Sequence, residues 1–586
     1  MDNKPFSSQK EKVLLAVAYS LPVVLLFWFV TNFSVNVPFA DDWGLVDFFE
    51  KIHSGTVNFR DFFSQHNEHR ILFPRIIFAI LAFSSKWNIK LEIYFTFLLA
   101  LVNFIILYKI AAYNWNEDNK ILFILFNLFN ITACLAHFSL NQYENWLWGF
   151  QITWLFINTC LILAIFILTV PKNLLPNIRL LLASLCCFIA SFSSAHGLLS
   201  WVAILPSVYL LEGTNKQKKI RILVWMGVFA FCVAIYSIGY EKPSYHPNTF
   251  FIFQKPLIAS KYFFTLIGFS LLKNTFPPVL TGLIILLVFF FFNLFSFTNQ
   301  QSNFANKAAP WLSLGWFAVL FASMTTVGRA GFGVEQATSS RYISVSILLF
   351  ISCLQLCGLW ILYKWQEQAK KKYIFLVFCL SFLISISIYI STDSIAEGQL
   401  IWIQRKAGKN CLELINYIDK SITNSPSNCL NFIFPDQLLI RKLSPVLQKL
   451  EFRDFPQNLT FITKADKVHG YIDLPPTTKQ PLNIRSSDVL KLSGWAILPE
   501  GQEQPPIVLL SYGNSQSFFA TGFVYLNRPD VAKALNSNLY NTSGWEAIIS
   551  LKSIPAGESV IKAWVYDRIS QQFIKLNGEP KITVVE

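Results

Sequence analysis

Two adjacent carboxylates, Asp41 and Asp42, follow residues 13–31, an apolar run long enough to cross a membrane. Asp is a preferred residue at helix starts, so a structural cap is one interpretation of the pair. The other is acid–base chemistry, because neighbouring carboxylates repel, and a carboxylate with a raised pKa is suited to take a proton from a hydroxyl. We favour the second interpretation and place Asp41 ahead of Asp42 as the base. The amphipathic stretch 43–52 then predicts a helix at the bilayer surface.

A second polar group follows in "QHNEHRILFPR", residues 65–75. If this stretch is helical, His66, His69 and Arg70 lie on one side of it. Arg70 and His69 are then candidates to bind a phosphate, and His66 and Glu68 are candidates to position an acceptor. A structural polar network is the alternative.

A divalent metal ion is a further alternative for the first loop. A His-x-x-His pair with a carboxylate can ligate such an ion, which makes Asp42, His66 and His69 the metal candidates. The sequence establishes no cofactor.

Three later segments carry further candidates. Tyr143 and Glu144 in "NQYENWLWGFQ" suit a pocket for a sugar or a lipid head group, with an aromatic membrane-interface belt as the alternative. His196 in "SSAHG" fits a substrate contact or a satisfied polar residue between helices equally well. Arg329 and Arg341 suit phosphate binding, because a guanidinium can contact two phosphate oxygens at once; membrane anchoring is the alternative for Arg341. We expect all these residues to meet in one cavity that opens to the exterior.

The composition identifies the class of protein. Of the 586 residues, 53% are hydrophobic and 14% are charged, whereas soluble proteins are about 25% charged. The net charge of +14 does not indicate nucleic-acid binding, because the basic residues gather in short loops between apolar runs. That distribution is the positive-inside bias of cytoplasmic loops.

The apolar runs predict eleven spans, with the N-terminus in the cytoplasm. Residues 71–83 and 254–273 are too short or too charged and are predicted to lie in the interface. Residues 32–89, 139–149, 241–275, 328–342 and everything after 392 then face outward. The predicted spans are 13–31, 90–110, 121–138, 150–170, 179–195, 198–211, 220–240, 276–297, 310–327, 343–363 and 373–391.

The hydrophilic tail has two parts. Residues 392–456 show helical periodicity, and residues 457–586 contain short β-rich runs separated by turn residues, which is typical of a β-sandwich. Cys411 and Cys429 lie in this tail, where a disulfide is allowed if the tail is extracytoplasmic. Three tryptophans of the tail are predicted to be core residues rather than a glycan platform: Trp495, Trp545 and Trp564.

The fold class is therefore a polytopic α-helical membrane protein with a C-terminal extracytoplasmic β-sandwich-like domain. Its predicted domains are 1–391 in the membrane, a helical connector over 392–456, and the β domain over 457–586.

The layout of residues 10–400, with its "ADDW", "HNEHR" and "SSRY" elements, resembles the GT-C superfamily of polytopic membrane glycosyltransferases. The resemblance implies transfer of a sugar from a polyprenyl-phosphate carrier to a lipid, glycan or protein acceptor, outside the bacterial cytoplasmic membrane. It also implies that an acidic residue of the first outward loop is the base, which here is Asp41 or Asp42. Membrane lipids are the other expected partners.

Other functions stay open. A flippase or transporter for a lipid-linked saccharide would place charges near the midplane and show internal repeats, and neither feature is visible in the sequence. A non-catalytic scaffold with a glycan-binding β domain leaves the acidic pair and "HNEHR" unexplained. An O-antigen ligase or polymerase is the related enzymatic alternative.

Overall fold

The structure is a computed structural model that describes residues 9–115, 120–269, 277–299, 303–365, 381, 392–420, 428–473, 482–498 and 502–585. Contacts divide the chain into two compact units. The helical unit comprises Met1–Ser34, Asn58–Phe83 and Lys90–Gly398. The mixed unit comprises Val35–Val57, Ser84–Ile89 and Gln399–Glu586, so it takes in two pieces of the predicted first outward loop together with the tail.

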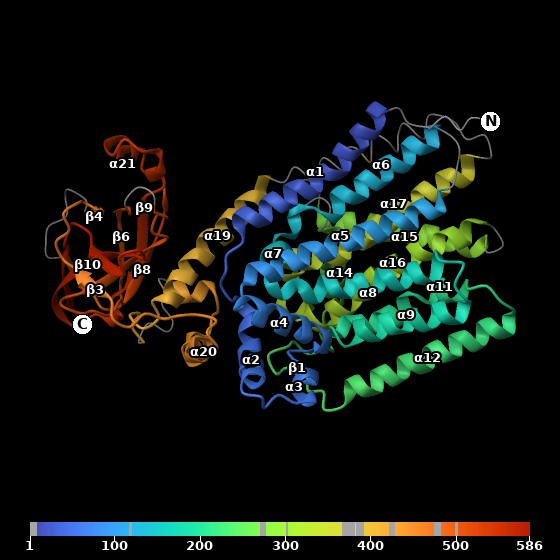
Figure 1. Ribbon diagram of the computed structural model, residues 1–586, viewed down its shortest axis with the longest axis horizontal. Helices are drawn as coiled ribbons and strands as arrows, with labels where there is room; N and C mark the ends of the chain where they lie inside the picture. Colours follow the sequence, from blue (N-terminus) through green and yellow to red (C-terminus); the bar gives the residue numbers. More distant parts are fainter. Residues whose placement is uncertain are drawn as a thin grey trace. The chain divides into compact units, whose positions relative to one another are not determined.

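The helical unit consists of helices that run alongside one another (Figure 1). Within its described residues, eight helical segments are long and apolar enough to cross a bilayer, as expected for a multi-pass membrane protein. Its helices are α1 (Gln9–Phe33), α3 (Phe59–Phe63), α4 (Leu72–Ser85), α5 (Ile89–Asn114), α6 (Lys120–His137), α7 (Tyr143–Leu147), α8 (Ile152–Thr169), α9 (Pro176–Ser191), α10 (Leu199–Ala203), α11 (Leu205–Tyr209), α12 (Asn215–Ser237), α13 (Phe251–Gln254), α14 (Pro256–Gly268), α15 (Pro278–Thr298), α16 (Asn303–Arg329) and α17 (Ile343–Trp365).

The burial pattern of this unit fits a lipid environment. Leu161, Phe317 and Ile347 are fully buried between helices, whereas Leu223 and Leu294 on outer faces are 74% and 67% exposed. Large apolar side chains on an outer surface are stable where the surrounding solvent is itself apolar.

Three of the eleven predicted spans do not coincide with the eight long helices. Segment 179–195 corresponds to α9, which has 16 residues, and segment 198–211 divides into α10 and α11. The division falls at Ile204, two residues before Pro206, because proline lacks the N–H that would continue the hydrogen bonds of α10. Segment 373–391 lies outside the described residues. Segment 71–83 corresponds to the short helix α4, and segment 254–273 contains α14 and follows α13. The interfacial position of both segments stays a prediction.

The amphipathic stretch after the acidic pair belongs to the mixed unit. It forms the 3₁₀ helix η1 (Ala40–Leu45) and then α2 (Val46–His53). Phe49 is fully buried, with ring centroids 5.1 Å from Trp87 and 5.9 Å from Phe452. The apolar side of α2 therefore packs on protein and is not free to lie on a bilayer. The other helices of this unit are α19 (Thr392–Glu413), whose first residues belong to the helical unit, α20 (Gln437–Lys449) and α21 (Pro529–Ala534).

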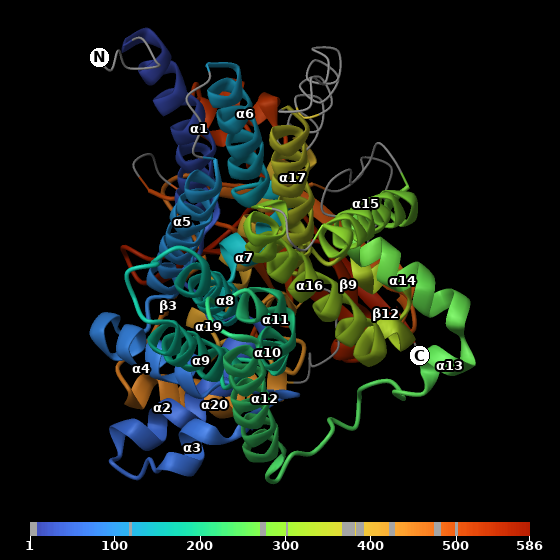
Figure 2. The same ribbon diagram turned by 90° about the vertical axis from the view of Figure 1, so that its right-hand side faces the viewer.

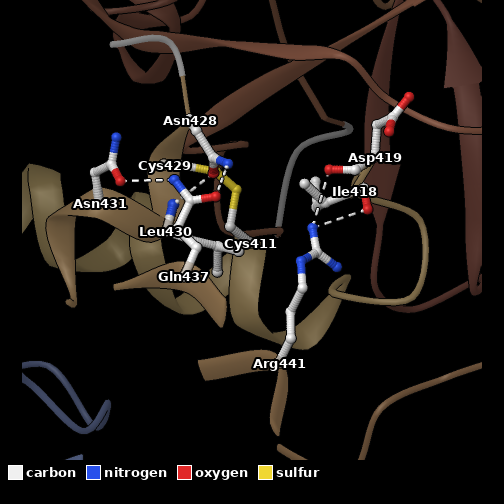
Figure 3. Close-up of a disulfide and its surroundings, with 9 residues drawn as sticks. All are labelled: Cys411, Ile418, Asp419, Asn428, Cys429, Leu430, Asn431, Gln437 and Arg441. Atoms are coloured by element: carbon white, nitrogen blue, oxygen red, sulfur yellow. Dashed lines mark hydrogen bonds between the residues drawn. A yellow bond between two sulfur atoms is a disulfide. The ribbon is translucent and has the colours of Figure 1, made fainter. Parts of the chain in front are cut away.

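A disulfide closes the helical connector (Figure 3). It joins Cys411 at the end of α19 to Cys429, with the Cα atoms 6.0 Å apart. Beside it, Asn428 Nδ2 donates to Gln437 Oε1 at 2.6 Å, and the Arg441 guanidinium donates to backbone carbonyls of the loop after α19. The bond that the sequence left open is thus present in the structure.

The β-rich tail is confirmed as a β domain. In the described part of the tail, ten strands form one hydrogen-bonded sheet in the order β3-β11-β10-β7-β8-β9-β6-β4, with β12 paired to β10 and β5. Trp545 and Trp564 are buried core residues as predicted, and Trp495 is half-buried. The strands are β3 (Thr460–Ile462), β4 (Gly470–Asp473), β5 (Leu482–Arg485), β6 (Val489–Ala496), β7 (Ile507–Tyr512), β8 (Ala520–Leu526), β9 (Gly544–Ser550), β10 (Gly557–Asp567), β11 (Gln572–Lys575) and β12 (Lys581–Val585).

Candidate functional site

Residues 65–70 form a tight hairpin instead of the helix considered from the sequence. Strands β1 (Gln65–His66) and β2 (His69–Arg70) pair antiparallel, with His66 opposite His69. Asn67 turns the chain with a φ of 50°, a left-handed conformation that asparagine tolerates better than most residues. This turn places Glu68 at the tip of the hairpin.

The loop that follows α12 fixes the hairpin from one side. Gln65 Nε2 donates to the Glu241 carbonyl at 2.5 Å, and the Glu241 N–H donates back to Gln65 Oε1 at 3.1 Å. The Tyr245 hydroxyl donates to Asn67 Oδ1 at 2.7 Å. The tip is therefore held by residues some 175 positions further along the chain.

Arg70 fixes the hairpin from the other side. Its guanidinium donates to three backbone carbonyls: Tyr236 at 2.8 Å, Phe63 at 3.0 Å, and Ile238. The residue is 4% exposed, and its ring neighbours are Phe63 and Tyr236. These contacts fit a structural tie between the hairpin, α3 and α12 better than the phosphate contact expected from the sequence.

Glu68 gathers three basic side chains from three segments. Arg329, the last residue of α16, donates through Nη2 to Glu68 Oε1, and His69 Nε2 lies 3.6 Å from the same oxygen. His246, from the loop after α12, places Nε2 at 3.4 Å from Glu68 Oε2, an ion-pair distance without hydrogen-bond alignment. The Arg329 and Glu68 side chains are 24% and 16% exposed, so the cluster is accessible to a ligand.

The charges of this cluster keep Glu68 ionised. Burial alone raises the pKa of its carboxyl, but His69, Arg329, a backbone hydrogen bond and His246 together lower that pKa to about 2. Burial lowers the pKa of His246, Arg329 and His69 lower it further, and Glu68 opposes them. Glu68 is therefore a fixed anion and a poor proton acceptor, whereas the lowered pKa of His246 favours its neutral form at neutral pH.

His69 has a defined orientation. The Ala195 backbone N–H donates to His69 Nδ1 at 3.3 Å, and the Ser194 hydroxyl lies at the same distance from that nitrogen. A backbone N–H can only donate, so Nδ1 is the acceptor and Nε2 carries the proton of a neutral ring. That proton is on the side of Glu68.

His196 lies next to this cluster and is enclosed. Its Nδ1 is 3.4 Å from Ser194 Oγ, its Nε2 is 3.4 Å from Thr325 Oγ1, and its ring centroid is 5.6 Å from that of His69. Because it is only 7% exposed, His196 supports the cluster from behind.

Glu144 caps the segment that carries Arg341. Its Oε2 accepts hydrogen bonds from Ser340 Oγ at 2.9 Å and from the Arg341 backbone N–H at 3.0 Å. Asn145 Nδ2 adds a bond to the Arg341 carbonyl at 3.1 Å. Glu144 therefore positions the 3₁₀ helix η7 (Ser340–Tyr342) at the start of α17, and half-buried Tyr143 precedes it on α7.

Aromatic side chains lie between the Glu68 cluster and the Glu144–Arg341 group. The Trp154 ring lies 5.3 Å from His196 and 6.0 Å from Tyr342, which follows Arg341. Phe321 contacts both partners of Trp154, with ring centroids 4.6 Å from His196 and 6.1 Å from Tyr342. Glu68, His69, His196 and Arg329 thus meet directly, and the Glu144–Arg341 group connects to them through Trp154.

The acidic pair belongs to the mixed unit. Asp42 is fully buried, and its Oδ2 accepts the Phe39 backbone N–H at 2.9 Å, which is the helix-cap geometry of the structural interpretation. Asp41 is half-buried. We still predict, from the sequence alone, that Asp41 and Asp42 meet the Glu68 cluster of the helical unit.

His66, one of the metal candidates, lies against an aromatic ring. The His66 ring lies tilted against the Phe150 ring, with the centroids 4.9 Å apart. Within the described ranges, no three His, Cys, Asp or Glu side chains are arranged to hold a metal ion.

Sequence reasoning missed His246. Its only signal is a single imidazole beside a proline in "SYHPNT", within the predicted outward segment 241–275. Compared with known proteins, the sequence matches no family model and no curated relative. The geometry of the Glu68 cluster is therefore the main indication of function.

Proposed function

We propose that the chain is a GT-C-type glycosyltransferase that moves a sugar from a polyprenyl-phosphate carrier to an acceptor hydroxyl. In this proposal it acts at the outer face of a bacterial cytoplasmic membrane, with about eleven spans, a cytoplasmic N-terminus and an extracytoplasmic β-sandwich-like domain. The observation that carries the proposal is the partly exposed cluster of Glu68, His69, His246 and Arg329 at the ends of apolar helices.

Arg329 is the phosphate ligand in this proposal. In the part of the chain that the structure describes, its guanidinium makes one hydrogen bond, through Nη2 to Glu68. Nε and Nη1 are therefore available to an anion, and Glu68 holds the group in place. A guanidinium oriented in this way stabilises the negative charge that develops on the leaving phosphate.

Asp41 is the base in this proposal. Asp42 uses one carboxylate oxygen to cap η1, which leaves the half-buried Asp41 as the member of the pair suited to proton transfer from the acceptor. Glu68 is unsuited to that step because its pKa is about 2.

The test uses the purified full-length protein in lipid vesicles with a set of polyprenyl-phosphate-linked sugars, and it measures release of polyprenyl phosphate. Arg329→Gln should lower the rate at least about 100-fold, the usual effect of removing one charge-stabilising donor. Glu335→Gln is the matched control, because Glu335 is an exposed residue of the 3₁₀ helix η6 (Val334–Thr338) and lies outside the cluster. Full activity of Arg329→Gln would refute the phosphate assignment.

The acceptor can be identified by an experiment in cells. Mass spectrometry of surface glycans and lipids, with and without this protein, should show the loss of one sugar. Movement of lipid-linked saccharide across vesicle membranes without any new glycosidic bond would show a transporter instead.

A further inference from the structure

A groove away from the Glu68 cluster runs between α9 and α12, which lie side by side in both views (Figures 1 and 2). It encloses about 470 Å³. Asn177 and Arg221 lie at one end, Phe188 and Val228 lie at the other, and the side chains between them are apolar except for Ser184.

The length of the groove corresponds to one leaflet. Along α9 it extends from Asn177 to Phe188, and at about 1.5 Å per residue this is about 16 Å. Half of a hydrocarbon core is about 15 Å. Leu181 and Val224 line the groove and are 68% and 52% exposed, as expected for side chains that face lipid.

The polar end carries excess positive charge. Arg221 Nε donates to Asn177 Oδ1 at 3.0 Å, which fixes the guanidinium at the mouth of the groove. Glu212 is the one acidic residue between 171 and 230, and it is paired with Arg179 at 2.8 Å. Lys216 lies one turn before the lining residue Ile220 and Lys218 one turn before Arg221, so both are at the Arg221 end of α12. The Lys218 ammonium lies 5.3 Å from the centre of the Tyr209 ring.

We propose that this groove binds an anionic phospholipid, with one acyl chain between α9 and α12 and the phosphate beside Lys216, Lys218 and Arg221. The charge selects the occupant, because basic residues at a membrane surface attract anionic lipid head groups.

This site is separate from the proposed sugar-transfer site. Helix α12 extends from Asn215 to Ser237, about 34 Å, and the groove opens at its first turns. The hairpin contacts Tyr236 at the opposite end of α12. A lipid phosphate at Lys216 is therefore far from Arg329.

Native mass spectrometry of the full-length protein tests the chain pocket, with phosphatidylglycerol and phosphatidylcholine as probes. Wild type should retain phosphatidylglycerol in preference to phosphatidylcholine. Val224→Trp and Ser184→Phe fill the groove and should abolish retention. Leu223→Trp is the matched control, because Leu223 is 74% exposed and does not line the groove. Thermal unfolding confirms that each variant is folded.

The head-group contact is tested with two charge variants. Lys216→Gln with Lys218→Gln should weaken phosphatidylglycerol binding at least about fivefold, the effect of one basic residue at an anionic surface. Lys219→Gln should leave binding unchanged, because Lys219 lies one turn before Leu223, outside the groove. Equal binding of the two lipids by wild type, or retention of phosphatidylglycerol by both groove-filling variants, would overturn the proposal.

Discussion

The two polar motifs of the first predicted outward loop have different surroundings. Asp42 of "ADDW" is fully buried in the mixed unit and caps its own 3₁₀ helix. Glu68 of "HNEHR" belongs to the helical unit, is partly exposed, and contacts basic side chains from distant segments. Asp42 accepts a hydrogen bond from a backbone N–H three residues earlier, whereas Glu68 contacts side chains of α16 and of the loop after α12. Two acidic motifs of one loop therefore have different roles. Asp42 contributes to local folding, and Glu68 contributes to the assembly of the candidate site.

Arg70→Ala should have the largest effect on stability in this comparison. It removes three charge-assisted hydrogen bonds from a residue that is 4% exposed, so the hairpin should detach from α12 at a cost of about 3 kcal/mol or more. Hydrogen exchange over residues 60–70 should increase strongly. Arg60→Ala is the control, because Arg60 is exposed on α3. Unchanged exchange in Arg70→Ala would show that the hairpin is held by other contacts.

The double variant Cys411→Ser/Cys429→Ser should affect the stability of the mixed unit but not that of the helical unit. The disulfide joins two residues that are 18 positions apart in the chain. Its loss should destabilise the mixed unit by about 3 kcal/mol, mainly because the unfolded chain gains conformational freedom. Hydrogen exchange should rise over residues 399–473 and stay constant over α8 and α16. A reductant should reproduce the effect in wild type and add nothing in the variant.

The Glu68 cluster predicts a defined acid sensitivity. Glu68 stays ionised in the folded protein down to pH about 2, whereas the ordinary pKa of glutamate is 4.5. The cluster therefore stabilises the fold above pH 4.5, on the order of 2 kcal/mol, and this contribution is lost as the pH falls from 4.5 towards 2. Thermal unfolding across this window should show that Glu68→Gln lacks that part of the pH dependence. Glu335→Gln should keep the wild-type profile, and identical profiles for both variants would contradict the assigned pKa.

Asp42→Ala should destabilise the mixed unit by at least about 1 kcal/mol, the usual cost of losing a helix cap. Asp42→Asn should retain most of the stability, because the amide oxygen can still accept the Phe39 N–H. Asp41→Asn should leave the unfolding temperature unchanged and abolish sugar transfer. If Asp42→Asn also loses transfer while Asp41→Asn retains it, the roles of the two residues are exchanged.

The lipid groove shows how two distant segments produce a feature that neither has alone. Segment 179–195 was predicted as a span and corresponds to the shorter α9, and 220–240 corresponds to α12. The basic residues in the first turns of α12 were predicted to belong to a basic cytoplasmic loop. The sequence does not show that these basic residues lie at the end of an apolar groove, because the groove is formed by side chains from both helices.

The sequence alone determined the features that depend on local composition and periodicity. Long apolar runs indicated the membrane-spanning helices, and β-rich runs with turn residues indicated the C-terminal sheet. Each of these depends on residues close together in the chain, whose hydrophobicity or hydrogen bonding is set locally.

Only the tertiary structure decided which polar groups meet. It brought His246 and Arg329 to Glu68, assigned Arg70 to backbone carbonyls, and put Asp41 and Asp42 in the mixed unit. The physical reason is that a partly buried charge is stabilised by whichever partners the packed helices bring near it, and those partners are more than 150 residues away in the chain.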